Sequence, residues 1–221
     1  MFHTSRHSQM AKIACCLPVS ILFIVMATLP VNTAHAALFG YRETTNTNLD
    51  IFPQWVSVLE RHIKEDVPEG NCDSSVFNTC HLKEWYAFLE SIKHESRQEQ
   101  MDEVNAYANK KSYVLDIDNY GVEDYWAIVK EFLYNSGDCE DYSIFKFMSF
   151  RWLGFKAESM RIVVLEDINL GIAHAVLAIY TDDDILIFDN QTEEIVSHKD
   201  ISHYVPIYSV NESRWWMHLP S

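Results

Sequence analysis

Cys139 stands among acidic residues at the start of an apolar segment. The sequence Gly137-Asp138-Cys139-Glu140-Asp141 precedes a run rich in aromatic and aliphatic residues. Asp138 has the type and place of a helix N-cap, so Cys139 would begin a helix that is buried on most sides. Unpaired N–H groups and the dipole at a helix N-terminus favour a thiolate and can help to stabilise an oxyanion. By itself the pattern is weak, because a buried structural cysteine is the more common interpretation.

A nucleophilic cysteine needs a base, and the base needs a group that orients it. Most histidines beyond residue 36 lie in polar or helical contexts that suggest the surface or ordinary packing. His174 differs because it opens an apolar strand over residues 174–180. A histidine packed in a strand is common, so His174 alone is also a weak signal.

The orienting group is expected at the end of the next strand. The apolar run that follows is continuous, as in a central strand covered on both faces, and it ends at Asp189 and Asn190. A hairpin that pairs Tyr180 with Ile185 makes Asp189 a diagonal neighbour of His174, about 7–8 Å away between Cα atoms. A register shift of one residue would exchange Asp189 and Asn190. The order of cysteine, histidine and aspartate is therefore geometrically coherent.

Helices are expected to precede strands along the chain. The helices are predicted from about Asp50 with Pro53 in the first turn, along Leu82–Ile92, from the Ser96 and Glu99 capping box to about Lys110, over about Glu123–Tyr134, and from Cys139 to Leu153 with Gly154 as its stop. The strands are predicted over residues 161–165, 174–180, 185–188, 205–210 and 215–219. Residues 40–50 are expected to be irregular and residues 116–121 a polar connector. This order indicates an α+β fold with an antiparallel sheet.

Composition limits the class of protein. The chain has 221 residues, of which 48% are hydrophobic and 22% charged, and its formal net charge is −15. These values indicate a globular protein with one domain, or one domain and an extension. So acidic a balance argues against nucleic acid or anionic lipid as the main partner.

The first 36 residues have the order of a secretory signal peptide. Arg6 and Lys12 precede an apolar run that ends near Pro30, and Ala34-His35-Ala36 resembles a cleavage site. An uncleaved membrane anchor is the alternative, but Pro18 and the small-residue exit favour cleavage. We therefore predict a signal peptide over residues 1–36 and a single exported domain over residues 37–221, with no membrane insertion after cleavage.

Three cysteines would remain after cleavage, namely Cys72, Cys80 and Cys139. An odd number in an oxidising compartment implies a free or reactive thiol. Cys72 and Cys80 flank a short loop and could form a local disulfide. Cys139 would then be the thiol left over.

Three motifs stand in the order found in a known family. They are Asn135–Tyr142 (NSGDCEDY), Ala173–Leu177 (AHAVL) and Phe188–Asn190 (FDN). With them the chain resembles the bacterial transglutaminase-like cysteine proteases of the LapG type. The resemblance implies a papain-like, transglutaminase-like fold, with Cys139 as nucleophile, His174 as base and then acid, and Asp189 as the group that orients His174.

The resemblance also implies a biological setting. Members of the family are periplasmic and calcium-dependent, and they cleave large surface adhesins near the N-terminus at a pair of alanines, which releases biofilm cells. An inner-membrane receptor that senses cyclic di-GMP holds the protease back. Many such families have a polar residue before the histidine, where this chain has Ile172-Ala173.

The carboxylates around Cys139 give the calcium expectation a physical basis. Asp138, Glu140 and Asp141 would oppose ionisation of the thiol if their charges were uncompensated. Bound Ca²⁺, which prefers oxygen ligands, would cancel that field and fix the loop. The alternative is that Asp138 only caps the helix while Glu140 and Asp141 favour its dipole. With the resemblance, the metal is the favoured interpretation.

Two other functional classes stay open. Another acyl-transfer enzyme with the same three residues, such as a transglutaminase or an amidase, is the main alternative to an endoprotease. A calcium-binding module with a dead catalytic site is disfavoured by the complete set of cysteine, histidine and aspartate.

Overall fold

The structure, a computed structural model, describes residues 1, 37–65 and 80–221. Residues 2–36 of the predicted signal peptide and Cys72 lie outside the described residues. Cys80 is disulfide-bonded and Cys139 is free, while the pairing of Cys80 with Cys72 stays a prediction. Within the described ranges, none of the helices combines the length and the apolar character needed to cross a membrane.

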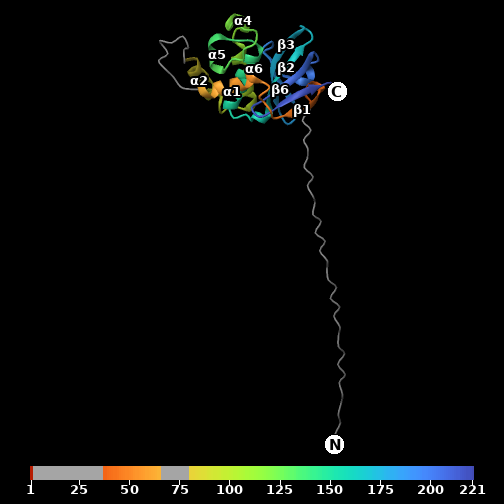
Figure 1. The fold of residues 1–221 in the computed structure, drawn as a ribbon. Helices are drawn as coiled ribbons and strands as arrows, with labels where there is room; N and C mark the ends of the chain where they lie inside the picture. Colours follow the sequence, from red (N-terminus) through yellow and green to blue (C-terminus); the bar gives the residue numbers. More distant parts are fainter. Residues whose placement is uncertain (2–36, 66–79) are drawn as a thin grey trace. The chain divides into compact units, whose positions relative to one another are not determined.

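Helices occupy most of the first part of the chain and strands the second, as the colours of Figure 1 show. The helices are α1 Pro53–Glu65, α2 Cys80–Ile92, α3 Arg97–Asn109, α4 Asp116–Asn119, α5 Val129–Asn135 and α6 Cys139–Trp152, with short 3-10 turns η1 Leu38–Gly40, η2 Ala157–Ser159 and η3 His198–Asp200. The strands are β1 Arg42–Asn46, β2 Met160–Asp167, β3 Ile172–Tyr180, β4 Ile185–Phe188, β5 Val196–Ser197, β6 Tyr204–Val210 and β7 Trp215–Leu219.

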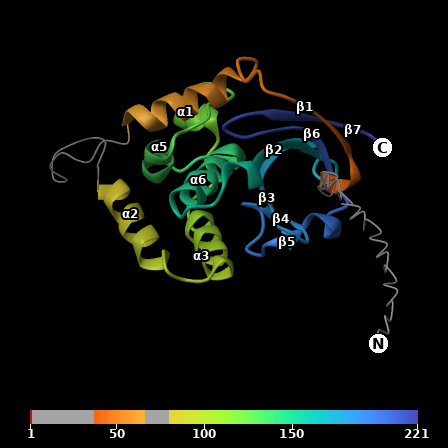
Figure 2. The same ribbon diagram turned by 90° about the horizontal axis from the view of Figure 1, so that it is seen from below.

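Helix α6 lies at the centre of the helical layer. It packs against β2 and β3, and α3 and α5 pack against it in turn (Figure 2). Aromatic residues cover this helix on several sides, and Phe145, Phe147 and Phe150 are fully buried. Gly154 follows the helix with a φ of +83°, a conformation that other residues adopt at a cost, so the chain turns there into β2. Helix α6, which begins at Cys139, is thus packed directly on the sheet.

The strands form one seven-stranded antiparallel sheet in the order β1-β7-β6-β2-β3-β4-β5. Both faces of its centre are apolar. Ile162 and Leu177 face the helices, while Val163 and Val176 belong to a second apolar cluster. In the β3–β4 hairpin Tyr180 pairs with Ile185, which confirms the predicted register.

The prediction of a helix over residues 123–134 was wrong in its first half. Helix α5 begins only at Val129. The N–H groups of Tyr125, Ala127 and Ile128 donate to side-chain carboxylates and not to helical carbonyl groups. Local propensity could not show this, because two of those carboxylates come from α4 and α6.

Two strands, β1 and β5, and the short helix α4 were missed. Residues 42–46, expected to be irregular, form the edge strand β1 against β7, and the expected connector over 116–121 contains α4. Strand β1 is mostly exposed and polar, so it lacks the apolar alternation by which strands are recognised. Its pairing depends on β7, at the other end of the chain.

Candidate active site

Helix α6 places the Cys139 thiol at the beginning of strand β3. The helix starts at Cys139 and packs on β3, and the backbone N–H group of Ala175 lies near enough to the thiol to oppose the rise of its pKa. Ala175 directly follows His174 in the strand. The fold therefore brings the candidate nucleophile and the candidate base to the same end of β3.

His174 and Asp189 form a buried pair. Their side chains are each 2% exposed, and His174 Nε2 lies 3.0 Å from Asp189 Oδ1. Asp189 also accepts hydrogen bonds from the Tyr204 hydroxyl and from the N–H group of Gln191. Burial tends to raise the pKa of Asp189, but these hydrogen bonds and His174 together hold that pKa below its ordinary value. Asp189 is therefore a carboxylate near neutral pH.

The charge of Asp189 determines how a neutral His174 carries its proton. A carboxylate only accepts hydrogen bonds, so His174 Nε2 must be the donor in this pair. In a neutral imidazole the other nitrogen, Nδ1, is then free to take a proton. Asp189, and not Asn190, makes this contact, while the side-chain oxygen of Asn190 is buried and has no hydrogen-bond partner among the described residues.

Four carboxylates crowd together beside the nucleophile. Oxygen atoms of Asp116, Asp138 and Asp141 lie within 4.8 Å of one another, and Glu140 forms similar groups with Asp116 and Asp124 and with Asp138 and Cys139. Burial is the main cause that raises the pKa values of Asp116, Glu140 and Asp141, and neighbouring carboxylates add to it. We call Asp116, Asp138, Glu140 and Asp141 the carboxylate cluster.

The carboxylate cluster has the properties of a cation site. Asp116 Oδ1, Asp138 Oδ1 and Asp141 Oδ2 are buried and have no hydrogen-bond partner in the described part of the chain. Leaving a buried carboxylate oxygen unpaired is unfavourable unless a cation or another donor meets it. Ca²⁺ takes several carboxylate oxygens in an adaptable shell, so these residues fit that ion.

Asp138 occupies the N-cap position of α6, but the expected capping bond is absent, because its side chain accepts no hydrogen bond from the first turn. Asp141 also contacts a segment outside its own helix, because its Oδ1 accepts a hydrogen bond of 2.7 Å from the N–H group of Ala127. A Cβ atom at Gly137 would collide with the Asp141 carboxylate. The alternative in which these acids only support the helix terminus is therefore disfavoured.

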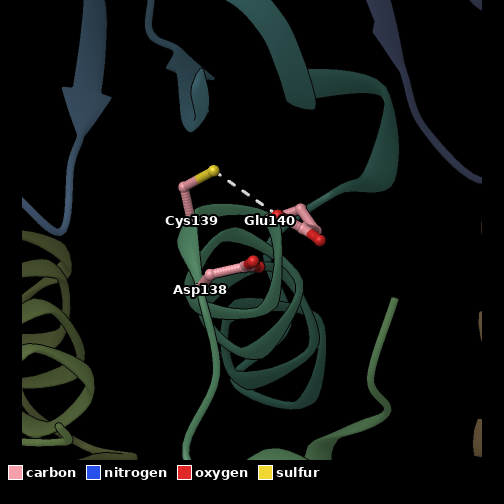
Figure 3. A group of neighbouring side chains, drawn as sticks. All are labelled: Asp138, Cys139 and Glu140. Atoms are coloured by element: carbon pink, nitrogen blue, oxygen red, sulfur yellow. Dashed lines mark hydrogen bonds between the residues drawn. The ribbon is translucent and has the colours of Figure 1, made fainter. Parts of the chain in front are cut away.

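Glu140 connects the carboxylate cluster with the nucleophile. The Cys139 thiol donates a hydrogen bond of 3.4 Å to Glu140 Oε2 (Figure 3). Burial raises the pKa of the Cys139 thiol, and the negative charges of Glu140 and Asp138 raise it further. Without a compensating positive charge, the site holds Cys139 as a thiol.

Sequence reasoning missed three residues of this site. Asp116 and Asp124 lie in segments that were expected to be a connector and a helix, and Tyr204 begins the strand β6. Acidic residues in polar segments and a tyrosine in a strand are ordinary features. No pattern in the sequence distinguishes them from surface or core residues.

The profile of one protein family matches residues 72–221, and its description is bacterial transglutaminase-like cysteine proteinase BTLCP. Among solved structures, Legionella pneumophila LapG is 26% identical with a TM-score of 0.58, and the match covers 72% of this chain and 87% of that chain. The calcium-bound form of that protein matches at 24% identity with a TM-score of 0.58, over 73% of this chain and 86% of that chain. The EGTA-treated form matches at 26% identity with the same TM-score, over 72% of this chain and 84% of that chain. None of the curated proteins matches. These findings confirm the resemblance and the transglutaminase-like α+β fold.

Proposed function

Because the chain belongs to the bacterial transglutaminase-like cysteine proteinases, we propose that it is a calcium-dependent cysteine endopeptidase with a triad of Cys139, His174 and Asp189. The observation that carries the proposal is the buried hydrogen bond between His174 and Asp189, at the end of the strand where Ala175 contacts Cys139. A structural cysteine would not need a base whose tautomer is fixed in this way.

The residues have these roles in peptide hydrolysis. His174 Nδ1 takes the proton of Cys139, and the sulfur attacks the scissile carbonyl carbon. N–H groups at the beginning of α6 stabilise the resulting oxyanion, and His174 then gives its proton to the leaving amine. Water, deprotonated by His174, splits the thioester and restores the thiol. Asp189 keeps the imidazole oriented throughout and stabilises its charged form.

Calcium is proposed to bind in the carboxylate cluster, where Asp116, Asp138, Glu140 and Asp141 would hold it. Its chemistry there is to supply positive charge against the carboxylate field and to fix the loop before α6. The unpaired buried oxygen atoms support this proposal, and so does the calcium-bound form of the similar Legionella protein. Glu140 is the residue through which the cluster acts on Cys139, because its carboxylate touches the thiol.

The proposed substrate is a large exported adhesin that is cut near its N-terminus at a pair of alanines, in the periplasm. The release of that adhesin would disperse a biofilm, and an inner-membrane receptor that senses cyclic di-GMP would restrain the protease. The resemblance to LapG-type proteases and the predicted signal peptide support this setting. The adhesin and the receptor are expected from the family resemblance.

The test uses the exported protein, purified, with Ca²⁺ and an N-terminal fragment of a candidate adhesin. The fragment is compared with one in which the di-alanine is changed to two arginines, and the protease with its Cys139→Ala variant. We expect two products whose summed mass exceeds the fragment by one water, for the wild-type pair only. Cross-linked products or a loss of ammonia would instead favour a transglutaminase or an amidase. Equal cleavage by Cys139→Ala would remove the proposal.

A further inference from the structure

The segment just after the predicted cleavage site is docked into the fold. Leu38 is fully buried in the second apolar cluster, the one that contains Val163 and Val176. The N–H group of Phe39 donates to His198 Nδ1 at 3.0 Å, although the two residues are 159 positions apart. Phe39 adopts φ +51° and ψ +20°, a left-handed conformation that is uncommon for a bulky residue. The surroundings therefore hold η1 in one defined place against β6 and η3.

Tyr204 joins this segment to the catalytic pair. Its ring contacts that of Phe39 edge-on, with 5.9 Å between centroids, and that of His174, with 5.7 Å between centroids. Its hydroxyl donates to Asp189 Oδ2, while His174 meets Oδ1 of the same carboxylate. Tyr204 thus touches both members of the pair, and Phe39 touches Tyr204.

We infer that Tyr204 is a positioning residue of the proposed triad and that the N-terminal segment, residues 37–40, holds it in place. The inference rests on the proposed function. A carboxylate whose two oxygens are both engaged cannot rotate, so the direction of the His174 Nε2–H bond, and with it that of Nδ1, becomes fixed. The Tyr204 ring limits the tilt of the imidazole, and Phe39 limits the movement of Tyr204.

The charged and titratable groups around Asp189 come from several elements. His174 faces it from β3 and Tyr204 from β6, while Lys146 of α6 donates to its backbone carbonyl at 3.1 Å. Asp167 of β2 lies close enough to act on Tyr204. Among these groups, Tyr204 is the neutral donor whose removal changes the hydrogen bonding of the carboxylate and leaves all charges in place.

The first experiment replaces the hydroxyl alone. Tyr204→Phe should lower kcat by about tenfold to hundredfold, with KM within about twofold, because the base is less well aligned. The acidic limb of the kcat profile should move to higher pH, since Asp189 loses a donor that stabilises its charge. Tyr180→Phe is the matched control, because that buried tyrosine also meets a carboxylate, Glu43, but lies at the other end of β3. It should keep the kcat of the wild type.

The second experiment removes the support. Phe39→Ala should lower kcat in the same direction, and combining it with Tyr204→Phe should add little, because Phe39 acts through Tyr204. Phe155→Ala is the control for lost packing, since that half-buried ring packs on Phe150, with 4.9 Å between centroids, and belongs to the helix-side apolar cluster, whereas Phe39 and Tyr204 belong to the second cluster. It should lower the melting temperature without changing kcat.

A readout independent of activity separates this inference from the proposed function. The His174 ring N–H that meets Asp189 should give a downfield proton signal in NMR, and Tyr204→Phe and Phe39→Ala should shift or broaden it while the two controls do not. If the wild type cleaves nothing, the proposed function fails and this signal still decides the inference. Unchanged kcat, pH limb and proton signal in Tyr204→Phe would overturn it.

Discussion

At the scale of single residues, Asp189 collects partners from separate elements. His174, Tyr204 and the Gln191 N–H group share its carboxylate, while Lys146 and Asn109 donate to its backbone carbonyl. Both carboxylate oxygens and the backbone carbonyl of Asp189 are thereby engaged in hydrogen bonds. A residue fixed so completely can orient a base without taking the proton itself.

Removal of any triad member should abolish most of the activity. Cys139→Ala, His174→Ala and Asp189→Ala should each lower kcat by at least about a thousandfold, because the three residues act as a unit. Asn190→Ala is the neighbouring control and should stay within a few-fold of the wild type. Initial rates of peptide cleavage, with circular dichroism to verify folding, measure these effects. A severe loss in Asn190→Ala but not in Asp189→Ala would contradict the assigned roles.

Asp116, which the sequence did not reveal as a site residue, can be tested directly as a calcium ligand. Asp116→Asn should weaken calcium binding by roughly tenfold, because it removes one charge from a site of several carboxylates. Asp118→Asn is the matched control, since Asp118 lies on the same short helix but is exposed. Calorimetric titration of both variants gives the affinities. Equal affinities would place Asp116 outside the metal site.

At the scale of elements, helix α6 carries most of the chemistry. Its first turn holds the nucleophile together with Glu140 and Asp141, and two turns later Lys146 lies fully buried beneath Asp189. Burial lowers the pKa of Lys146 to about 7, although the charge of Asp189 opposes that shift. The helix thus contains a group whose ionisation depends on folding.

Lys146 should make stability depend on pH. Between about pH 7 and 10.5 the unfolded chain binds a proton at this residue that the folded chain does not bind, so its contribution to stability rises with pH in that window. The free energy of unfolding of the wild type, relative to Lys146→Met, should rise by up to about 1.4 kcal/mol per pH unit from pH 7 to 9. Urea unfolding measures it, with Lys110→Met at the exposed end of α3 as control. A flat difference would show that Lys146 is charged in both states.

At the scale of the whole described fold, the carboxylate cluster joins segments that are separate in sequence. Asp116 comes from α4 and the other three acids from the start of α6, while Asp124, from the segment before α5, lies beside Asp116 and Glu140. Repulsion among these groups opposes folding when no cation is present. A bound cation would therefore stabilise the arrangement of all three segments together.

Calcium should raise the melting temperature as well as the activity. At a hundred times the dissociation constant, a ligand that binds only the folded state adds about 2.7 kcal/mol of stability. EGTA should reverse both effects, and Mg²⁺ should replace Ca²⁺ poorly because it demands a tighter octahedral shell. Scanning calorimetry with and without each ion measures the stability, and cleavage assays measure the activity. A protein stripped of metal that keeps its melting temperature and its activity would rule out the calcium site.

Elements with a strong local signal were predicted well. The capping box of Ser96 and Glu99, the stop of α6 at Gly154 and the β3–β4 register depend on neighbours along the chain, and the structure confirms all three. The start of α5 and the edge strand β1 were not predicted. Their hydrogen bonds are made with partners that are distant in sequence, and the local pattern of apolar residues does not indicate such partners.

The sequence by itself determined the order of Cys139, His174 and Asp189 and the elements that carry them, because helix starts and a tight hairpin are set by residues close in sequence. Only the tertiary structure decided that Asp116 joins Asp138 and that Tyr204 meets Asp189. The first contact depends on how α4 lies beside the start of α6, and the second on the strand order, which places β6 and β4 on either side of β2 and β3. Packing brings together polar atoms from remote segments, and burial then gives those atoms the chemical properties that they lack in water.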